Sequence, residues 1–197
     1  MDSEIRIRMA SPEEAGALLE IYRPYVAKTA ISFEYQVPSP EEFRNRIGHI
    51  LDRYPWLVLE RDQEIAGYAY AAPFKERAAY DWAVETTIYI GWEHRGRGYG
   101  RMIYQKLEEI LARQNILNLN ACIACTRLDD PYLTNASMEF HRHMGYRLVG
   151  EFRQCGYKFG RWYDMVWMEK LLGTHPEQPR PVIPVSELAG SGIVAGF

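Results

Sequence analysis

The stretch "HRGRGYG", residues 94–100, places three glycines at alternate positions beside two arginines and a histidine. It follows the β-prone run at 87–90 and precedes residues 101–114, whose apolar side chains recur at helical spacing. A glycine-rich turn between a strand and a helix directs several backbone N–H groups outward together. The N-terminus of the following helix adds a partial positive charge at the same place. Because glycine also lets a ligand approach the backbone closely, the stretch predicts a site for phosphate oxygens.

The spacing of the glycines separates three kinds of phosphate-binding loop. A P-loop requires G-x-x-x-x-G-K-[ST], and a dinucleotide fingerprint requires G-x-G-x-x-G followed by an acidic residue about twenty positions later. Here the spacing is G-x-G-x-G, and the next predicted strand ends in "CTRLDD", residues 125–130. The series Arg95, Gly98 and Gly100 fits Q/R-x-x-G-x-G/A instead, and so resembles the coenzyme A pyrophosphate loop of the GNAT superfamily of N-acetyltransferases. A tight turn without a ligand is the structural alternative.

Four further strings extend this resemblance over roughly residues 5–170. In chain order they are "DRYPWLVLE", "AGYAYAAPFKERAAYDWAVETTIYI", "FHRHMGY" and "CGYKFGRWYD". Together they resemble the phosphinothricin N-acetyltransferase branch of the superfamily. The resemblance implies a V-shaped opening between the fourth and fifth strands that binds acetyl-CoA, and it implies a homodimer.

Periodicity along the chain predicts a mixed α/β (α+β) domain in the order β-α-α-β-β-β-α-β-α-β-β, with a mostly antiparallel sheet flanked by helices. Ser11, Pro12 and Glu14 form a capping-box start, and "SPEEF" at 39–43 repeats the signal. The segment at 55–72 predicts a hairpin, and two last strands are expected around Gly156 and Gly160. We therefore expect a catalytic domain over residues 1–170 and a proline-containing extension over 171–197, either loose or docked.

Composition narrows the classes of function. The chain has 197 residues, 47% of them hydrophobic and 25% charged, as is usual for a globular domain with a core. A net charge of −3 does not favour nucleic-acid binding, and no apolar run is long enough to cross a bilayer or form a signal peptide, so we expect a cytoplasmic protein. Cys122 and Cys125 lie in a predicted strand with odd separation, facing opposite sides, so no metal is expected.

Acetyl transfer from a thioester needs a neutral amine, and Glu85 is the candidate base that would produce it. Its apolar and aromatic strand context, "YDWAVETTIYI", predicts burial and a raised carboxyl pKa. The resemblance assigns the same role to the matching Glu. A strand glutamate that faces solvent is the alternative.

His141 is the second catalytic candidate, four residues before Gly145. In the wider superfamily a Tyr at this place is proposed to protonate the departing thiolate, and the resembled branch has His. His141 would supply that proton, or orient Glu85 or a water molecule. A buried structural histidine is the alternative.

The resemblance also carries over the residues that contact substrates. Lys75, Arg77 and Tyr80 match K-x-R-x-x-Y, which grips the anionic part of an amino-acid substrate, whereas a solvated charged loop is the alternative. For acetyl-CoA, the resemblance implies that the backbone around Ile88–Ile90 pairs with the pantetheine amides as an added strand does. The residues that it implies for acetyl-CoA binding are Ile88, Tyr89, Ile90, Arg95, Gly96, Arg97, Gly98, Tyr99, Gly100, Asn135 and Ser137. At the usual Asn position before Ser137 this chain has Thr134, with Asn135 one place later, so that contact departs from the pattern.

We therefore expect an acetyl-CoA-dependent N-acetyltransferase acting on the α-amine of a small amino acid or analogue, resembling enzymes for phosphinothricin or methionine sulfoximine. Three other functions stay open: acetylation of a protein N-terminus or other amine, a non-catalytic acetyl-CoA-binding module, and a phosphate-binding regulator. The binding module would keep the glycine loop but would not need Glu85 or His141, and the presence of both disfavours it.

Overall fold

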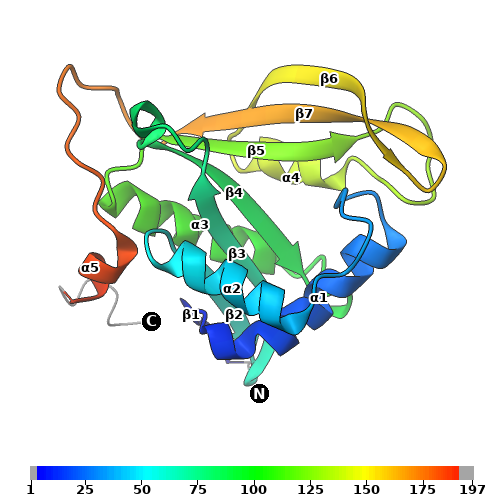
Figure 1. The fold of residues 1–197 in the computed structure, drawn as a ribbon, viewed down its shortest axis with the longest axis horizontal. Helices are drawn as coiled ribbons and strands as arrows, with labels where there is room; N and C mark the ends of the chain where they lie inside the picture. The colour runs from blue at the N-terminus through cyan, green and yellow to red at the C-terminus, as the bar shows by residue number, and fades with distance from the viewer. Residues whose placement is uncertain (1–3, 191–197) are drawn as a thin grey trace.

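In the computed structural model, which describes residues 4–190, seven strands form one mixed sheet in the order β1-β2-β3-β4-β5-β7-β6 (Figure 1). All neighbouring strands are antiparallel except β4 and β5, which are parallel. The strands are β1 (Ile5–Met9), β2 (Trp56–Arg61), β3 (Glu64–Pro73), β4 (Ala83–Ile90), β5 (Asn118–Cys125), β6 (Arg147–Lys158) and β7 (Arg161–Leu171). The predicted fold class and order of elements are confirmed.

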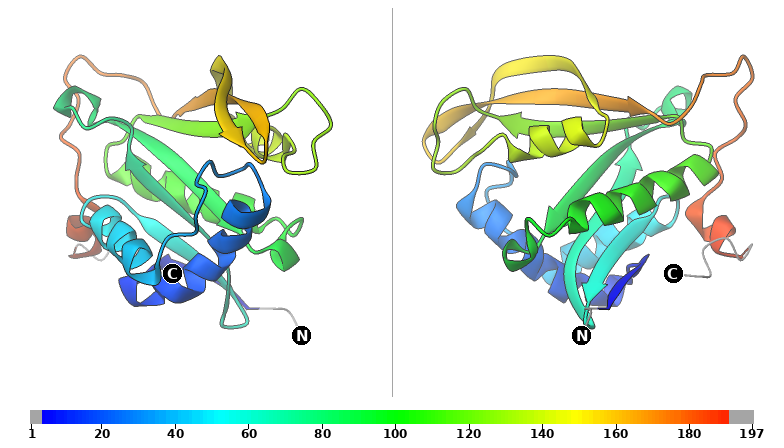
Figure 2. Two further views of the ribbon diagram at one scale, coloured as in Figure 1. Left: turned by 45° about the vertical axis from the view of Figure 1, so that its right-hand side comes forward. Right: turned by 180° about the vertical axis from the view of Figure 1, so that it is seen from behind.

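The helices cover both faces of the sheet. They are α1 (Ala15–Lys28), α2 (Pro40–Leu51), α3 (Tyr99–Arg113), α4 (Ala136–His143) and α5 (Val185–Gly190), with short 3₁₀ turns η1 (Pro12–Glu14), η2 (Ala78–Tyr80) and η3 (Trp92–His94). The helices α1 and α2 lie on one face, and α3 and α4 on the other, as the view from behind in Figure 2 shows. Buried side chains from these helices and from β2 to β5 form one large core.

Both predicted helix starts are present. The Ser11 side chain accepts a hydrogen bond from the backbone, and the Glu14 carboxylate accepts one from the Ser11 N–H at 2.8 Å, which completes the capping box. At α2 the Ser39 hydroxyl accepts from the Glu42 N–H at 3.1 Å. Pro24 lies inside α1, which continues to Lys28.

The last hairpin differs in one detail from its prediction. The turn between β6 and β7 lies at Phe159 and Gly160, which have φ angles of 51° and 75°. Gly156 is instead inside β6, beside an irregularity in its pairing with β7. A Cβ there would lie 2.2 Å from the Phe33 ring, so this glycine is required by close packing rather than by a turn.

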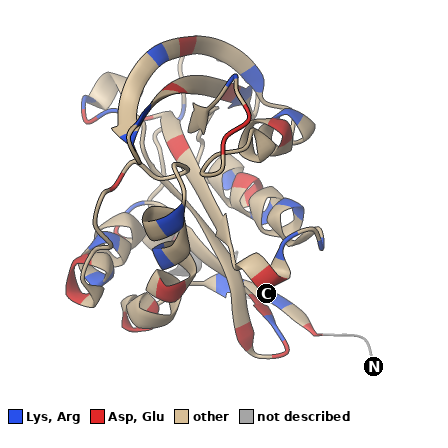
Figure 3. Ribbon diagram, turned by 90° about the vertical axis from the view of Figure 1, so that its right-hand side faces the viewer, with Lys and Arg blue, Asp and Glu red and all other residues tan. Residues whose placement is uncertain are grey.

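The remaining expectations concern cysteines and charges. Cys125 is buried and Cys122 exposed, as the odd separation predicted. Basic and acidic residues are interspersed over helices and strand ends (Figure 3). Within residues 4–190, no helix is long and apolar enough to span a membrane, and no group of three or more His, Cys, Asp or Glu side chains could hold a metal ion.

Candidate active site

The strands β4 and β5 separate after only three paired residues. Their last pair is Glu85 with Asn120, although β4 continues to Ile90 and β5 to Cys125. The separation opens a cleft of about 610 Å³ in the sheet, the V predicted from the resemblance. Its walls come from α1 and the α1–α2 loop, from the strands β3 to β7, and from α4. They include Tyr22, Phe33, Glu34, Tyr70, Glu85, Cys122, Ser137, His141, Cys155 and Met165.

A buried polar network holds the point where the two strands part. The Thr86 hydroxyl lies 3.2 Å from the Asn120 carbonyl oxygen, to which it donates, and so replaces backbone pairing there. It also lies 2.6 Å from the Tyr104 hydroxyl and 3.1 Å from the Tyr146 hydroxyl. Since Thr86, Tyr104 and Tyr146 are buried and hydrogen-bonded to one another, the network fixes α3 and the segment that follows α4 against the apex of the cleft.

Glu85 lines the cleft at its apex and is half-buried. Burial raises the pKa of its carboxyl, and the nearby Lys75 ammonium partly opposes that rise. Its two strand neighbours, Val84 and Thr86, are fully buried, so Glu85 is the acidic side chain that this part of β4 turns toward the cleft. A carboxylate so placed can accept a proton from a bound amine.

His141 lies on α4, is 3% exposed, and has a polar atom within hydrogen-bond distance of each ring nitrogen. Its Nδ1 lies 2.8 Å from the Ser137 carbonyl oxygen, which can only accept, so Nδ1 carries the proton. The Nε2 atom lies 2.9 Å from the Tyr104 hydroxyl. Burial lowers the pKa of His141 to about 4, which keeps the ring neutral at physiological pH.

The glycine loop is arranged as an anion site would require. Gly96 and Gly98 have φ angles of +72° and +83°, and a Cβ at either would meet nothing within 4 Å. Gly98 caps α3 without a side-chain hydrogen bond, so N–H groups of the first turn lack a side-chain cap. Arg95 leaves this loop to stack between Tyr25 and Trp92, 4.8 Å from each ring centroid.

Three further loop positions differ among themselves. Arg97 is exposed beside the glycines. The side chain of Tyr99 is buried, so any contact of this residue with a ligand falls to its backbone. A Cβ on Gly100 would lie 3.3 Å from Phe140, which shows that this glycine lets α3 approach α4 closely.

The unpaired edge of β4 offers fewer free groups than the prediction included. Both the N–H and the carbonyl of Ile90 contact the Tyr25 hydroxyl, so the backbone polar groups of Ile90 face away from β3, and by alternation those of Tyr89 face β3. The Ile90 carbonyl accepts a hydrogen bond from the Tyr25 hydroxyl at 2.6 Å. By strand alternation the Ile88 amide and carbonyl face the cleft edge, where β5 has already diverged. Ile88 is therefore the position suited to pair with an incoming extended chain.

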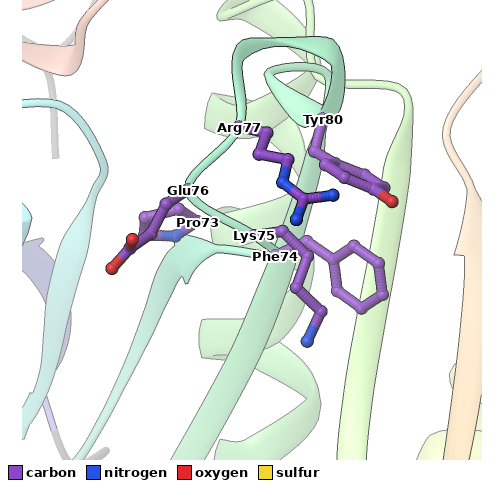
Figure 4. A pocket seen from close by; sticks show the side chains of 6 residues that line it. All are labelled: Pro73, Phe74, Lys75, Glu76, Arg77 and Tyr80. Atoms are coloured by element: carbon purple, nitrogen blue, oxygen red, sulfur yellow. The ribbon is translucent and has the colours of Figure 1, made fainter.

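A second hollow, of about 620 Å³, lies where β3 passes into β4 and is lined by residues 73–77 and 80. The Arg77 guanidinium points into it beside the Tyr80 ring, whereas Glu76 is directed away (Figure 4). The Lys75 ammonium lies 4.9 Å from the Phe74 centroid and 5.6 Å from that of Trp167. The predicted acceptor residues thus lie together, with their cations exposed.

At the start of α4 the two remaining predicted residues have structural partners. The Asn135 amide donates to the Thr126 carbonyl at 2.9 Å and accepts from the Thr126 N–H at 3.1 Å, which ties β5 to α4. Ser137 lines the cleft, and its carbonyl accepts the His141 bond.

Sequence reasoning missed the cleft residues contributed by the α1–α2 loop. Phe33 and Glu34 line the cleft, and one buried carboxylate oxygen of Glu34 has no hydrogen-bond partner while the other binds Arg46 at 2.7 Å. The loop is held by Lys158, whose ammonium donates to the carbonyls of Val26, Thr29 and Ser32 at 2.6–2.9 Å. The string "ISFEYQ" between two helices carried no periodic signal that could have placed it here.

Comparisons with known proteins agree with this geometry. The family described as "Acetyltransferase (GNAT) domain" matches residues 7–167. That match spans most of the chain.

The chain belongs to the GNAT acetyltransferase family.

Individual relatives place it within that family. It is 34% identical to a phosphinothricin N-acetyltransferase of Streptomyces viridochromogenes over 93% of this chain and 96% of that protein. It is 27% identical to an L-methionine sulfoximine/L-methionine sulfone acetyltransferase of Salmonella typhimurium, over 86% of this chain and 95% of the relative. A solved phosphinothricin acetyltransferase of Sinorhizobium meliloti, in complex with acetyl-CoA, superposes with a TM-score of 0.79 at 30% identity, covering 92% of this chain and 97% of that one.

Proposed function

We propose that this GNAT protein transfers the acetyl group of acetyl-CoA to the α-amine of a small amino acid or analogue, of the kind represented by phosphinothricin and methionine sulfoximine. The observation that carries the proposal is the half-buried Glu85 at the apex of the cleft, between the glycine loop at one end of β4 and the exposed cations of residues 75–77 at the other. The names of the relatives support the acceptor class.

The residues present fit acetyl-CoA, which would supply an activated acetyl thioester. Gly96, Gly98 and the first turn of α3 would hold its pyrophosphate, because their backbone N–H groups are accessible and no side chain covers them. Ile88 would pair with the pantetheine amides as an added strand does. Arg95 would add positive charge from its place between two rings.

Glu85 would act as the general base. A free amino acid is mostly an ammonium ion at pH 7, and only the neutral amine carries the lone pair needed for attack. A carboxylate whose pKa is raised by burial is a stronger base than a surface carboxylate and so accepts that proton more readily. Lys75 and Arg77 would hold the acceptor's carboxylate and so orient its amine toward Glu85.

Of the roles predicted for His141, positioning has the better support. A ring with a pKa of about 4 is not an imidazolium at neutral pH, and its single N–H proton, on Nδ1, is already donated to the Ser137 carbonyl. We propose that His141 orients Tyr104 and Thr86 and thereby keeps β4 and β5 apart at the correct point.

The His141→Gln variant tests this role. We expect kcat to fall less than about 10-fold, with its pH dependence between pH 6 and 9 unchanged and stability reduced by about 1–3 kcal/mol as buried partners lose their bonds. His143→Gln is the matched control, because His143 makes the same bond to a carbonyl four residues earlier but is exposed. If kcat instead fell 100-fold or more, and the decline of the wild-type rate at alkaline pH disappeared in the variant, His141 would be the proton donor.

A homodimer is part of the proposal. Apolar side chains on β6 and β7 are exposed in the single chain, with Leu148 and Val149 at 59%, Phe152 at 53% and Trp162 at 60%. A large exposed apolar area at a sheet edge supports a protein partner, and the resemblance points to a second copy.

The decisive assay measures thiol release from acetyl-CoA with a panel of amines. We expect release to be stimulated by phosphinothricin, methionine sulfoximine or small amino acids, and not by their N-acetylated forms, in which the nitrogen lone pair is delocalised into an amide. Release with N-terminal peptides alone would favour a protein N-acetyltransferase. Tight acetyl-CoA binding without release for any amine would favour a binding module.

A further inference from the structure

The residues after β7 form an extended segment that returns along the body of the protein. Residues 172–188, here called the C-terminal strap, leave the end of β7, pass the turn between β3 and β4, and end in α5 (Figures 1 and 2). Val185 and Leu188 of α5 are 3% and 5% exposed, so the strap is docked by buried apolar side chains. The docked alternative predicted for this extension is therefore the one observed up to residue 190, and residues 191–197 lie outside the described part.

The strap is fixed by hydrogen bonds that its sequence is suited to make. Its prolines have no N–H to satisfy, so an extended "QPRPVIP" presents mainly carbonyl acceptors to the body. The Asn115 amide donates to the Pro181 carbonyl at 2.8 Å, and the Gln114 amide donates to the Ile183 carbonyl at 2.7 Å. The backbone carbonyl of Gln114 in turn accepts a hydrogen bond from the Ile183 N–H at 3.0 Å.

Two residues at the end of the acceptor loop are joined to the same strap. The Trp82 indole N–H donates to the Arg180 carbonyl at 2.8 Å. Asp81 pairs with Arg53 at 3.1 Å, and the Arg53 carbonyl accepts from the strap N–H of Val185 at 3.0 Å. The loop that carries Lys75, Arg77 and Tyr80 therefore ends on the strap, three residues before Glu85.

The middle of that loop is held by ring contacts. Phe74 packs against Tyr80 and Trp167, with ring centroids 5.9 and 5.3 Å apart, while the side chains of Lys75, Arg77 and Tyr80 are exposed and the turn η2 has no side-chain cap. The Trp82 carbonyl, by contrast, accepts from the N–H groups of Leu117 and Asn118 at 2.9 and 3.0 Å. The C-terminal end of the loop is thus fixed where Trp82 is held between β5 and the strap.

We propose that the C-terminal strap is a positioning element for the acceptor: it holds the loop of residues 74–82 so that its cations face the cleft at Glu85. This inference rests on the proposed function for the identity of the acceptor site. The glycine loop lies at the opposite end of β4, so the strap acts on acceptor binding and not on acetyl-CoA. The similarity to the Streptomyces viridochromogenes enzyme covers 93% of the chain, a share too large to end at residue 170.

Three variants and a reference separate positioning from general stability. One variant ends at Gly173, and a second, Trp82→Phe, keeps an aromatic ring but removes the indole N–H. Asn115→Gly is the matched control, because it removes another 2.8 Å bond to the strap at a residue whose φ of 67° glycine adopts readily. Arg77→Gln is the reference for the acceptor site itself.

We expect Trp82→Phe to raise the acceptor KM about 3- to 10-fold, the value of one hydrogen bond, and the truncation to raise it at least as much. In both, kcat should stay within about twofold and the KM for acetyl-CoA should not change, whereas Asn115→Gly should leave all three constants as in the wild type. An unchanged acceptor KM in Trp82→Phe, in an assay where Arg77→Gln raises it, overturns the inference and leaves the proposed function standing.

Hydrogen exchange decides the matter independently of the acceptor. If Arg77→Gln leaves the acceptor KM unchanged, the acceptor site of the proposed function is wrong. Faster exchange of the amides at 74–82 in Trp82→Phe would then still support anchoring by the strap, and unchanged exchange would overturn it. Because Trp82→Phe is a single substitution, this test stands even if the truncated chain does not fold.

Discussion

Glu85→Gln is expected to lower kcat about 100- to 1,000-fold at pH 7, while acetyl-CoA binding is retained. The substitution keeps the shape of the side chain and removes its capacity to accept a proton, so the cost falls on amine deprotonation. Burial raises the pKa of Glu85, and the base is active when deprotonated, so wild-type kcat/KM should rise with pH through that raised pKa. In the variant the deficit should shrink as alkaline pH supplies neutral amine from solution.

Steady-state kinetics from pH 6 to 9, with acetyl-CoA affinity measured by calorimetry, test this result. Glu64→Gln is the matched control, since Glu64 is an exposed glutamate at the far end of the neighbouring strand β3 and should leave every constant unchanged. Turnover by Glu85→Gln equal to the wild type across the whole range would remove Glu85 from the mechanism. A loss of acetyl-CoA affinity instead of kcat would make it a binding residue.

The helices, strands and turns could be predicted because each depends on residues close together in the sequence. The Ser11 capping box, the hairpin turn at Asp62 and Gln63 between β2 and β3, and the positive-φ Gly145 that follows the C-cap of α4 each depend on neighbours within a few residues. The glycine loop is of the same kind, since Gly98 needs its left-handed φ whatever the rest of the protein does. These features could be derived from residue type and spacing.

The interior of the cleft could not be derived in the same way. Whether a strand pair closes or splays depends on what packs at the apex, and here Thr86, Tyr104 and His141 meet from three separate elements. Likewise Lys158 reaches the carbonyls of the α1–α2 loop across more than a hundred residues of sequence. Only the family resemblance supplied the V, and the role it gave His141 is the one the geometry supports least.

The parts of the candidate site also differ in how firmly hydrogen bonds hold them. The apex and the α1–α2 loop are held by buried hydrogen bonds, so Glu85 has a fixed place against the cleft walls. The acceptor cations extend from an exposed loop and depend on Trp82 and the strap. On the proposed function, the general base therefore lies on the rigid scaffold, and the residues that would choose the acceptor lie on the segment most easily altered by sequence change.

Gly98→Ala is the second large effect: acetyl-CoA affinity should weaken about 10- to 100-fold. The new Cβ would meet no protein atom within 4 Å, so it would project into the space where phosphate oxygens approach the backbone. In addition, a φ of +83° is strained for alanine, and relief of that strain would rotate the N–H groups at the α3 N-terminus away from a common anion. Calorimetric titration with acetyl-CoA measures this loss of affinity, and titration with pantetheine, which lacks the pyrophosphate, is the comparison.

Gly160→Ala separates ligand contact from backbone strain. Gly160 has a φ of +75° and equally open surroundings, but it lies in the β6–β7 turn, so alanine should cost the same roughly 1 kcal/mol of stability without touching the pyrophosphate site. If both variants lose the same stability but only Gly98→Ala binds acetyl-CoA more weakly, the loop contacts the pyrophosphate. Equal affinities in both variants would mean that the glycines serve only the turn, and a pantetheine affinity reduced as strongly as that of acetyl-CoA would move the contact from the pyrophosphate to the β4 edge.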